Sequence, residues 1–357
     1  MFESAETGNK ISKVAFAQAV PELREALLQA QIDLGLSGKF QVIILIGGVD
    51  GAGKSETVKI LSEWMDPRFI ETNAMGQPTE EELAHPPMWR FWRSLPPKGK
   101  IGIFFGSWYT TPIVSRVHGA IKGKDLDQAM DRVIRFEKML IDEGALILKF
   151  WLHLSKDTQK KRLENFEKNP ETRWRATEIE WAHFELYDKF RKVSERALHH
   201  TSTKAPWIIV EGTDPRYRYF TIGQTILNAL RERLDAGTLK EPPEPAPALP
   251  PITDRFMFNS LDFSQKMTKD EYEGKIEKYQ RKLNLLVRSP KFRKIPAILV
   301  FEGADAAGKG GGIRRVTGAL DPRTYRVTPI AAPTHEEKAH PYLWRFWRHM
   351  PRNGHFT

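Results

Sequence analysis

The sequence has 357 residues, which suggests about two domains, since one domain usually takes roughly 100–200 residues. Hydrophobic residues make up 40 % and charged residues 28 %, as in proteins that bury a core, and the absence of cysteine excludes disulfides, thiol nucleophiles and cysteine-based metal sites. The 55 lysines and arginines against 45 acidic residues leave a net charge of +10, which favours a polyanionic partner without specifying it.

No apolar run approaches the ~18 residues that a membrane span needs, because Lys149 interrupts the richest run, Ala145–Leu154. The first residues contain no basic segment followed by an apolar one, so we expect no signal peptide. The sequence therefore predicts a cytoplasmic protein without a membrane partner.

Short β-branched runs alternate with helical patterns along the first two thirds of the chain. The runs predict buried strands at Gln41–Ile46, Ile101–Phe105, Leu146–Leu154 and Trp207–Val210. Helical spacing occurs at Ser55–Trp64, Asp127–Ile141 and Thr158–Lys168. This alternation predicts an α/β fold with a parallel sheet that is covered on both faces.

The chain also repeats itself, because Lys309 stands 255 positions after Lys54 and the same offset joins several other motifs. Gly47–Ser55 returns as Glu302–Gly310, and Trp89–Arg93 returns as Trp344–Arg348. In the second copy, Ile298–Phe301 and Gly310–Leu320 predict the same order of strand, loop and helix.

Between the copies lies the proline-rich segment Glu241–Pro251, which favours an extended spacer. The predicted organisation is a first domain at residues 1–236, a linker at 237–261 and a second domain at 262–357. The second copy reaches Thr357, which is equivalent to Gly102 of the first copy, so we expect the second domain to be incomplete in this chain.

Gly48–Ser55 fits the Walker A phosphate-loop pattern G-x-x-x-x-G-K-[ST] between a predicted strand and a helix. Glycines let backbone amides converge on an anion, the lysine neutralises phosphate, and the serine hydroxyl can bind Mg²⁺. The predicted phosphate ligands of the first copy are Asp50, Gly51, Gly53, Lys54 and Ser55. Those of the second copy are Gly303, Ala306, Ala307, Gly308, Lys309 and Gly310, where only Gly310 departs from the strict pattern.

Each loop contains an acid, Asp50 or Asp305, that would repel polyphosphate unless a cation lay between them. We interpret these acids as Mg²⁺ ligands or as bases for the attacking phosphate oxygen. The alternative is that each stabilises an Asx-type turn.

Arginines follow each loop at helical spacing. Arg90 and Arg93 share one helix face in the first copy, and Arg345 and Arg348 are their equivalents. The planar guanidinium suits phosphate, but ion pairs or a solvated face are equally open, whereas the neighbouring tryptophans predict core packing. The run Lys160–Arg162 is typical of a solvated face or of a channel for a long anion.

Several segments resemble the polyphosphate kinase 2 family: Gly303–Gly311, Arg314-Arg315, Asp321–Arg323, Leu343–Arg348, Phe136-Glu137 and Lys149–Ser155. Two fused copies are similar to the branch that transfers a phosphoryl group from inorganic polyphosphate to AMP, forming ADP. The resemblance implies a three-layer α/β/α kinase-like sandwich with a helical lid and Mg²⁺. It also implies catalytic roles for Asp305, Lys309 and Arg345, phosphate contacts for Arg314 and Arg348, and metal binding by Asp305 and, in the first copy, Asp50.

The first copy departs from the family at one segment that resembles Phe-Asp-Arg-Ser-Trp-Tyr in its relatives. Phe105 stands where the family has the acid, and Gly106 stands where it has the arginine. The second copy stops just before this segment. We therefore expect a degenerate first site, and little activity from the chain as it stands.

Two other functions remain open at this point. One is an ATP-dependent nucleotide kinase on the same fold, and the other is a non-catalytic module that binds polyphosphate or nucleotides. We expect polyphosphate and a nucleotide (AMP or ADP) as partners and no nucleic acid, because no aromatic–basic RNA motif is present. The sequence leaves homo-oligomerisation open.

Overall fold

The computed structural model describes residues 1–236, 262, 264 and 266–357, so the predicted linker lies outside the described residues. The chain divides into two compact units. The first unit comprises Met1–Gln77, Ser94–Gly237 and His335–Tyr342, and the second comprises Pro78–Arg93, Thr238–Thr334 and Leu343–Thr357. Pro78–Arg93, a segment of the first sequence copy, thus belongs to the second unit.

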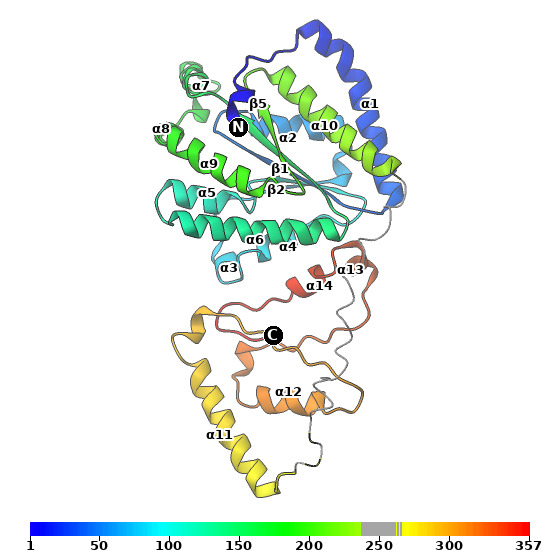
Figure 1. Cartoon of the computed structure of the whole chain (residues 1–357), viewed down its shortest axis with the longest axis vertical. Coiled ribbons are helices and arrows are strands. Elements are labelled where there is room, and N and C mark those ends of the chain that lie inside the picture. Colours follow the sequence, from blue (N-terminus) through cyan, green and yellow to red (C-terminus); the bar gives the residue numbers. More distant parts are fainter. Residues whose placement is uncertain (237–261, 263, 265) are drawn as a thin grey trace. The chain divides into compact units, whose positions relative to one another are not determined.

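The first unit contains a sheet of five parallel strands in the order β2-β3-β1-β4-β5 (Figure 1). The strands are β1 (Val42–Gly48), β2 (Ile70–Ala74), β3 (Ile101–Phe105), β4 (Leu146–His153) and β5 (Trp207–Glu211). Val42 of β1 lies opposite Ile101 on one side and Leu146 on the other. Because the strands are parallel, the loops that follow β1, β3 and β4 meet at one edge of the sheet.

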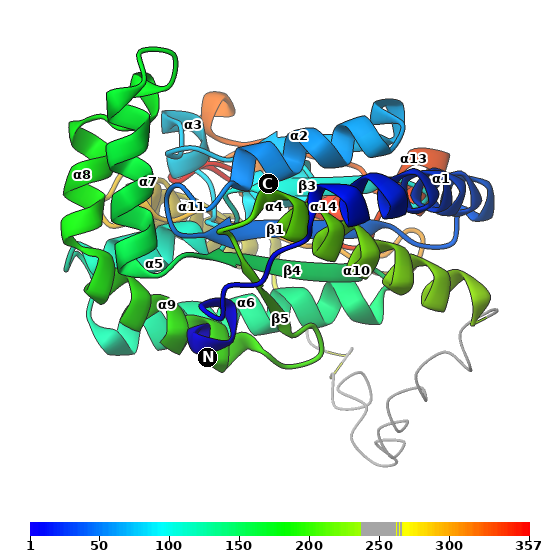
Figure 2. The ribbon, with the colours of Figure 1, turned by 90° about the horizontal axis from the view of Figure 1, so that it is seen from above.

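Helices cover both faces of this sheet (Figures 1 and 2). One face carries α1 (Lys13–Ser37), α2 (Lys54–Trp64) and α10 (Pro215–Asp235), and the other carries α5 (Thr110–Val117), α6 (Gly123–Asp142) and α9 (Tyr187–Thr201). On the first face, Leu27 of α1 and Ile226 of α10 pack with Ile44 of β1 in one buried cluster. The predicted three-layer α/β/α sandwich is confirmed for this unit.

A helical segment follows β4 at the carboxyl edge of the sheet. It consists of α7 (Lys156–Lys168), the 3-10 turn η3 (Arg173–Arg175) and α8 (Glu178–Glu185), and Figure 2 shows it at the end of the sheet where β1 enters its loop. Trp174 and Ile179 are largely exposed on it. Its place matches the lid that the resemblance implies.

The remaining elements are short, apart from one long helix in the second unit. They are η1 (Phe2–Ala5), η2 (Pro67–Phe69), α3 (Glu80–Leu83), α4 (Trp89–Arg93), α11 (Lys269–Val287), η5 (Phe292–Lys294), α12 (Lys309–Thr317), η6 (Pro322–Thr324), α13 (His335–Ala339) and α14 (Trp344–Trp347). Across the described part of the chain, no helix combines the length and the apolar character that a bilayer crossing would require.

The predicted strand at Ile298–Phe301 is wrong. These residues form no strand, and Val300 is 76 % exposed. Isolated bridges instead join Ala297 to Phe356 and Tyr325 to Phe356. Each bridge is equivalent, 255 residues later, to a pair in the first unit: Val42 with Ile101, and Ile70 with Ile101. The second unit therefore forms the first pairings of an equivalent sheet of its own and no more of it among the described residues.

The physical reason is the lack of strand partners. In the first unit, β1 is hydrogen-bonded along its length to β3 on one side and to β4 on the other. The equivalents of β4 and of most of β3 are not among the 357 residues. Only the start of the run is paired, because the Leu299 amide donates to the Thr357 carbonyl at 2.8 Å. An apolar run that lacks partner strands along its length cannot satisfy its backbone hydrogen bonds as a strand.

Candidate functional site

The first phosphate loop connects β1 directly to α2, which begins at Lys54 with Gly53 as its N-cap. Gly53 has φ +91°, and a Cβ atom there would lie 2.2 Å from the Arg218 guanidinium carbon, so only glycine fits. The backbone amides of Gly53, Lys54 and Ser55 make no hydrogen bond to any described residue. They form an open cradle for an anion at the start of a helix.

Side chains beneath the loop hold its carbonyl groups. Gln159 Nε2 donates to the Asp50 carbonyl at 2.9 Å, and Arg162 Nη1 donates to the Gly51 carbonyl at 2.7 Å. Arg162 Nη2 also donates to the Thr213 carbonyl at 2.8 Å. Arg162 therefore belongs neither to a solvated face nor to an anion channel, because its guanidinium is hydrogen-bonded to backbone carbonyls of the phosphate loop and of the segment after β5.

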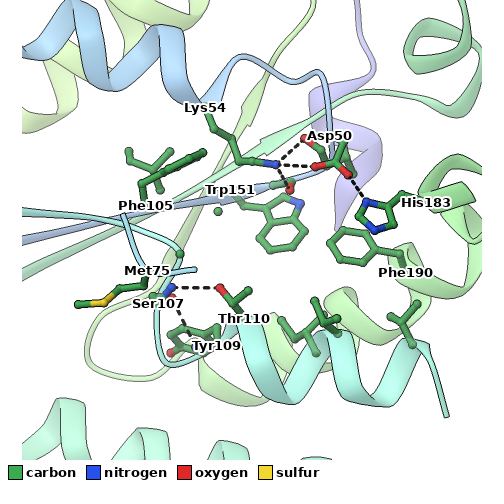
Figure 3. Close-up of a pocket in the computed structure, with 18 of the residues that line it drawn as sticks. Asp50, Lys54, Met75, Phe105, Ser107, Tyr109, Thr110, Trp151, His183 and Phe190 are labelled. Carbon is green, nitrogen blue, oxygen red and sulfur yellow. Dashed lines mark hydrogen bonds and ion pairs between the residues drawn. The ribbon is translucent and has the colours of Figure 1, made fainter. Parts of the chain in front are cut away.

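The charged groups of the loop are paired with one another (Figure 3). Lys54 Nζ donates to the carbonyls of Gly48 and Val49 at 2.9 and 3.1 Å and lies 3.2 Å from Asp50 Oδ1. Nδ1 of His183, on α8, lies 2.9 Å from Asp50 Oδ2. The lid-like segment is thus joined to the loop through Asp50.

These contacts shift the pKa values of both partners. Burial alone would raise the pKa of Asp50, but the charge of Lys54 and the hydrogen bond from His183 outweigh it and hold this pKa well below its usual range. The hydrogen bond to Asp50 raises the pKa of His183 above its ordinary value. Asp50 is therefore ionised, and it is already engaged by the charge of Lys54 and by the ring of His183.

A cavity of about 480 Å³ opens next to this ion pair. Aromatic side chains form much of its wall: Phe105 at the end of β3, Trp151 on β4 and Phe190 on α9, with the apolar face of α5 opposite (Figure 3). The structure thus brings Phe105 and Gly106, the two predicted departures from the family, to the same cavity as Lys54 and Asp50.

Gly106 could not simply become the arginine of the family. Its φ is +81°, and a Cβ atom would lie 2.4 Å from the Met75 carbonyl oxygen. Because L residues with side chains disfavour this region and the carbonyl is backbone, any side chain at this position requires the main chain to move. The loss of the arginine is therefore built into the backbone of the first copy.

A buried polar network fixes the segment that follows Gly106. Lys149 Nζ lies 2.8 Å from Glu137 Oε2, and both side chains are almost fully buried. Tyr109 OH and Trp108 Nε1 donate to Glu137 Oε1 at 2.7 and 3.0 Å, and Lys149 also donates to the Thr201 carbonyl. Burial lowers the pKa of Lys149, and the Glu137 charge opposes this shift.

The first site does not fit a Mg²⁺ ion as its residues stand. Asp50 is engaged by Lys54 and His183, and position 105, where the resemblance places a second acid, carries a phenyl ring. Within the described ranges, no group of three or more His, Asp or Glu side chains could hold a metal. Mg²⁺ prefers several oxygen ligands, which this site does not offer.

The second loop repeats the backbone of the first. Ala306 and Gly308 have φ +62° and +87°, against +75° and +91° at Gly51 and Gly53, and α12 begins at Lys309 as α2 begins at Lys54. Lys309 Nζ donates to the Gly303 and Ala304 carbonyls at 2.6 and 2.8 Å. Asp305 is exposed and forms no ion pair with any residue that the structure describes.

The other predicted residues of the second loop, Ala307 and Gly310, lie on it, and Arg314 is exposed on α12. A Cβ atom at Gly310 would meet no other atom within 4 Å. The loop therefore has room for the serine or threonine of the Walker A pattern, and steric hindrance does not explain the glycine.

The predicted arginines are packed rather than free. Arg93 lies over the Trp89 ring at 4.5 Å and Arg348 over the Trp344 ring at 4.8 Å. Arg345 is 5 % exposed and donates to the Ala331 carbonyl at 2.6 Å. Trp89 and Trp92 are buried, as predicted.

The structure also bears on which arginines belong together. Arg90 pairs with Glu82 at 3.4 Å, which supports the ion-pair alternative for this side chain. Arg90 and Arg93 belong to the second unit, whereas Lys54 belongs to the first.

Sequence reasoning missed His183, Trp151 and the Lys149–Glu137 pair. His183 lies 133 positions from Asp50, and Lys149 lies 12 positions from Glu137, a spacing that matches no helical or strand contact across elements. The only signal was that Phe136-Glu137 and Lys149–Ser155 both belong to segments shared with the family.

The parallel sheet, the phosphate loop between β1 and α2 and the lid-like helices define an α/β protein of the phosphate-loop kinase class. The family model of polyphosphate kinase 2 (PPK2) matches residues 10–236 and 266–357. The chain belongs to the PPK2 family.

Three relatives illustrate this membership. A polyphosphate:AMP phosphotransferase of Pseudomonas aeruginosa PAO1 is 52 % identical over 359 residues, covering 100 % of this chain and 72 % of the relative. One from Pseudomonas syringae pv. tomato is 49 % identical, with the same two coverages. An AMP/ADP-polyphosphate phosphotransferase of Meiothermus ruber is 32 % identical and covers 61 % of this chain and 82 % of its own.

Solved structures agree. A crystal structure assigned to polyphosphate kinase 2 of Pseudomonas aeruginosa PA01 superposes with a TM-score of 0.86 at 50 % identity, covering 100 % of this chain and 71 % of the other. Polyphosphate kinase 2 of Arthrobacter aurescens TC1 gives a TM-score of 0.61 at 28 % identity, covering 63 % of this chain and 82 % of the other.

Proposed function

We propose that the protein transfers a phosphoryl group from inorganic polyphosphate to AMP, forming ADP, and that the second copy carries the reaction. The observation that carries this proposal is the second loop, which keeps the backbone of a phosphate cradle, its lysine and an acid without an ion-pair partner in the described chain. The names of the relatives support the donor and the acceptor. We propose the cytoplasm as its location.

In this reaction an oxygen of the AMP phosphate attacks the terminal phosphorus of polyphosphate, and the bond from that phosphorus to the next bridging oxygen breaks. The amides of the second loop and Lys309 hold the phosphates at this junction. Arg314, which is exposed, would offset the charge of the polyphosphate chain, and Arg345 and Arg348 would do so only after leaving the Ala331 carbonyl and the Trp344 ring.

Asp305 is the residue of the second copy that would hold Mg²⁺, which would supply charge neutralisation between donor and acceptor. Its carboxylate is exposed and unpaired within the described residues, unlike that of Asp50. Asp50, which the sequence suggested as a second metal ligand, would first have to leave Lys54 and His183. We therefore assign no reaction step to the first copy. Its loop residues only bind phosphate: Gly51, Gly53, Lys54 and Ser55. Arg90 and Arg93 would contact polyphosphate only after leaving their present partners.

The test is ADP formation from AMP, polyphosphate and Mg²⁺, with the 357-residue chain and with a chain continued to the length of its P. aeruginosa relative by that relative's own residues. Lys309→Met should reduce turnover at least about 100-fold in whichever chain is active, because one preorganised electrostatic contact to the reacting group is removed. The matched Lys54→Met should leave most of it. Equal losses, or a reaction that uses ATP but not polyphosphate, would overturn the proposal.

A further inference from the structure

We propose that residues 1–9 form a pH-sensitive strap over the carboxyl ends of β4 and β5, which closes on His153 and opens when this histidine takes up a proton. The inference comes from contacts within the first unit and does not rest on the activity proposed for the second copy. Figure 2 shows this N-terminal segment beside α9, and only Phe2 and Ala5 among its nine residues are buried.

The first anchor of the strap is an aromatic stack. The ring of Phe2 is fully buried and lies over the ring of His153, with 4.6 Å between the centroids and 7° between the planes. The same ring stacks on Trp151 at 5.9 Å. Trp151 lines the cavity of the first copy and also stacks on Phe190, another residue of its wall, at 5.8 Å. The strap is therefore packed directly against the aromatic wall of the cavity.

The second anchor is a buried carboxylate at the end of β5. Glu211 lies opposite His153 in the register of β4 and β5. Its oxygens accept from the Gly8 amide at 3.1 Å and from the Asn9 amide at 3.0 Å. The Asn9 side chain donates to the same carboxylate at 3.2 Å. The two anchors thus lie on neighbouring residues of the sheet, and one of the two is a histidine.

The buried imidazole of His153 has a partner on one nitrogen only. Nε2 lies 2.7 Å from Glu6 Oε1 of the strap, and because a carboxylate accepts, Nε2 carries the hydrogen of the neutral ring. Nδ1 is buried and has no hydrogen-bond partner among the described residues. A second proton would have to go to Nδ1, where a buried N–H donor is costly without an acceptor. A released ring would avoid this cost by donating to water.

The charges around His153 do not remove this cost. Burial is the largest effect and lowers the pKa of His153, and Arg191 of α9 acts in the same direction, whereas Glu6 and Glu3 of the strap oppose them. The remaining titratable groups of the packed elements hold other partners: Glu211 the strap amides, Tyr187 the Leu154 carbonyl and Glu195 the Met1 amino group. The closed strap therefore holds the neutral ring.

The sign of the pH dependence follows from this lowered pKa. The stabilisation of the closed strap is complete above the pKa of an exposed histidine, about 6.5, and is lost as pH falls toward the lower value of the closed form. Acidification therefore releases Phe2 from Trp151, and the wall of the cavity loses one of its supports.

Single cysteines can report the opening, because the sequence contains no cysteine. Ala5→Cys places a thiol at a buried position of the strap, and Ser4→Cys places one at an exposed position as the matched reference. Mass spectrometry follows maleimide labelling of each 357-residue chain between pH 7.5 and pH 5.0. The ratio of the two rates removes the pH dependence of the thiol itself. This ratio should rise about 3- to 30-fold on acidification, where about 30-fold is the limit for one histidine of ordinary pKa.

Variants assign the change to His153. His153→Gln should make the ratio independent of pH, while His200→Gln, which removes a surface pair with Asp131, should leave the change as in the parent. Glu6→Gln keeps an acceptor for Nε2 but removes the charge that favours the protonated ring, so it should bring the change closer to the 30-fold limit. If His153→Gln fails to fold, Glu6→Gln decides between the outcomes.

Hydrogen exchange of residues 1–9 and 187–195, corrected for intrinsic rates, is a second measurement that needs no cysteine. Exchange in both segments should rise with the same pH profile, because α9 carries Phe190 of the wall. Unchanged exchange in α9 while the strap opens would show that the strap does not support the wall.

A parent ratio that does not change with pH, a pH dependence that survives in His153→Gln, or a smaller change in Glu6→Gln would each overturn the inference. These readouts involve no phosphate transfer, so their outcome is independent of the activity proposed for the second copy.

Discussion

The two phosphate loops of this chain have the same backbone and different surroundings. Gly48–Ser55 and Gly303–Gly310 both aim their lysine at two loop carbonyls, at equivalent positions 255 residues apart. Asp50 of the first loop contacts Lys54 and His183, whereas Asp305 forms no ion pair with the described residues. The shape of a phosphate loop is thus a local property of its residues, while its chemistry depends on side chains that other elements supply.

The strongest test of this comparison targets the support of the first site, the buried Lys149–Glu137 pair. Lys149→Met should lower the free energy of unfolding by about 3–5 kcal/mol, because the Glu137 carboxylate would remain buried without its cation. Chemical denaturation followed by circular dichroism measures this change.

The control for this prediction is Lys54→Met, which removes a half-buried lysine from the loop and should cost far less. In the second copy, the ion pairs Lys269–Glu273, Arg281–Glu277 and Arg323–Asp321 each have at least one largely exposed partner, unlike Lys149–Glu137. A loss below about 1 kcal/mol for Lys149→Met would show that the network does not hold the site.

The second prediction concerns the arginine that the first copy lacks. Gly106→Ala should destabilise the protein by at least about 2 kcal/mol, from the positive φ and from the contact of a Cβ atom with the Met75 carbonyl. Thermal unfolding measures the loss, and Gly76→Ala, where a Cβ atom would meet nothing within 4 Å, is the control. Equal stabilities would mean that the first site could regain the arginine easily.

The third prediction exchanges the residues at one equivalent loop position. Ala306 holds a left-handed φ of +62°, so Ala306→Gly should stabilise its unit by about 0.5–1 kcal/mol once the greater freedom of glycine in the unfolded chain is subtracted. Gly51→Ala should destabilise the first unit by a similar amount. Hydrogen exchange of α12 and of α2 measures the two changes separately, and the same sign at both positions would contradict the comparison.

The smallest effect is expected from pH. His183 has a pKa raised by its hydrogen bond to Asp50, so the stabilisation it gives is complete below its unfolded pKa of about 6.5 and is lost as pH rises through the higher folded value. Because the histidine is 48 % exposed, the effect should stay below about 1 kcal/mol.

Limited proteolysis of α7–α8 between pH 6 and pH 9 measures this loss of stabilisation, and cleavage should become faster at high pH. His183→Gln should remove the pH dependence, while His85→Gln, whose ring contacts a backbone carbonyl on α3, should not. Cleavage that is independent of pH in the parent protein would show that the contact between α8 and Asp50 contributes nothing.

Much of the first unit could be predicted from the sequence. The runs at Ile101–Phe105 and Leu146–Leu154 became β3 and β4, since continuous apolar residues are typical of strands buried on both faces. β2 (Ile70–Ala74) was missed, because three consecutive polar residues, Glu71, Thr72 and Asn73, occupy this edge strand and it is only partly buried. Ile298–Phe301 was predicted wrongly, because an apolar run specifies a strand only where partner strands are present.

The site was predictable in part. The phosphate loops follow from a contiguous pattern, and the departures at Phe105 and Gly106 follow from the resemblance. The contacts of Asp50 with His183 and of Glu137 with Lys149 join elements whose approach depends on tertiary packing, so no local pattern reveals them. Arg162 looked like one cation of a surface run, yet its neighbours in the fold are loop carbonyls.

The support beneath the first loop has a consequence for the kinetics of binding. With the carbonyls of Asp50 and Gly51 held by Gln159 and Arg162, the loop keeps one conformation before any ligand arrives. A preorganised binding site loses little entropy on association. The affinity of this loop for its ligand should therefore depend on the rate of dissociation rather than on a rearrangement before binding. Replacing Arg162, which donates to the Gly51 carbonyl and does not line the cavity, should therefore shorten the residence time of a ligand bound at this loop.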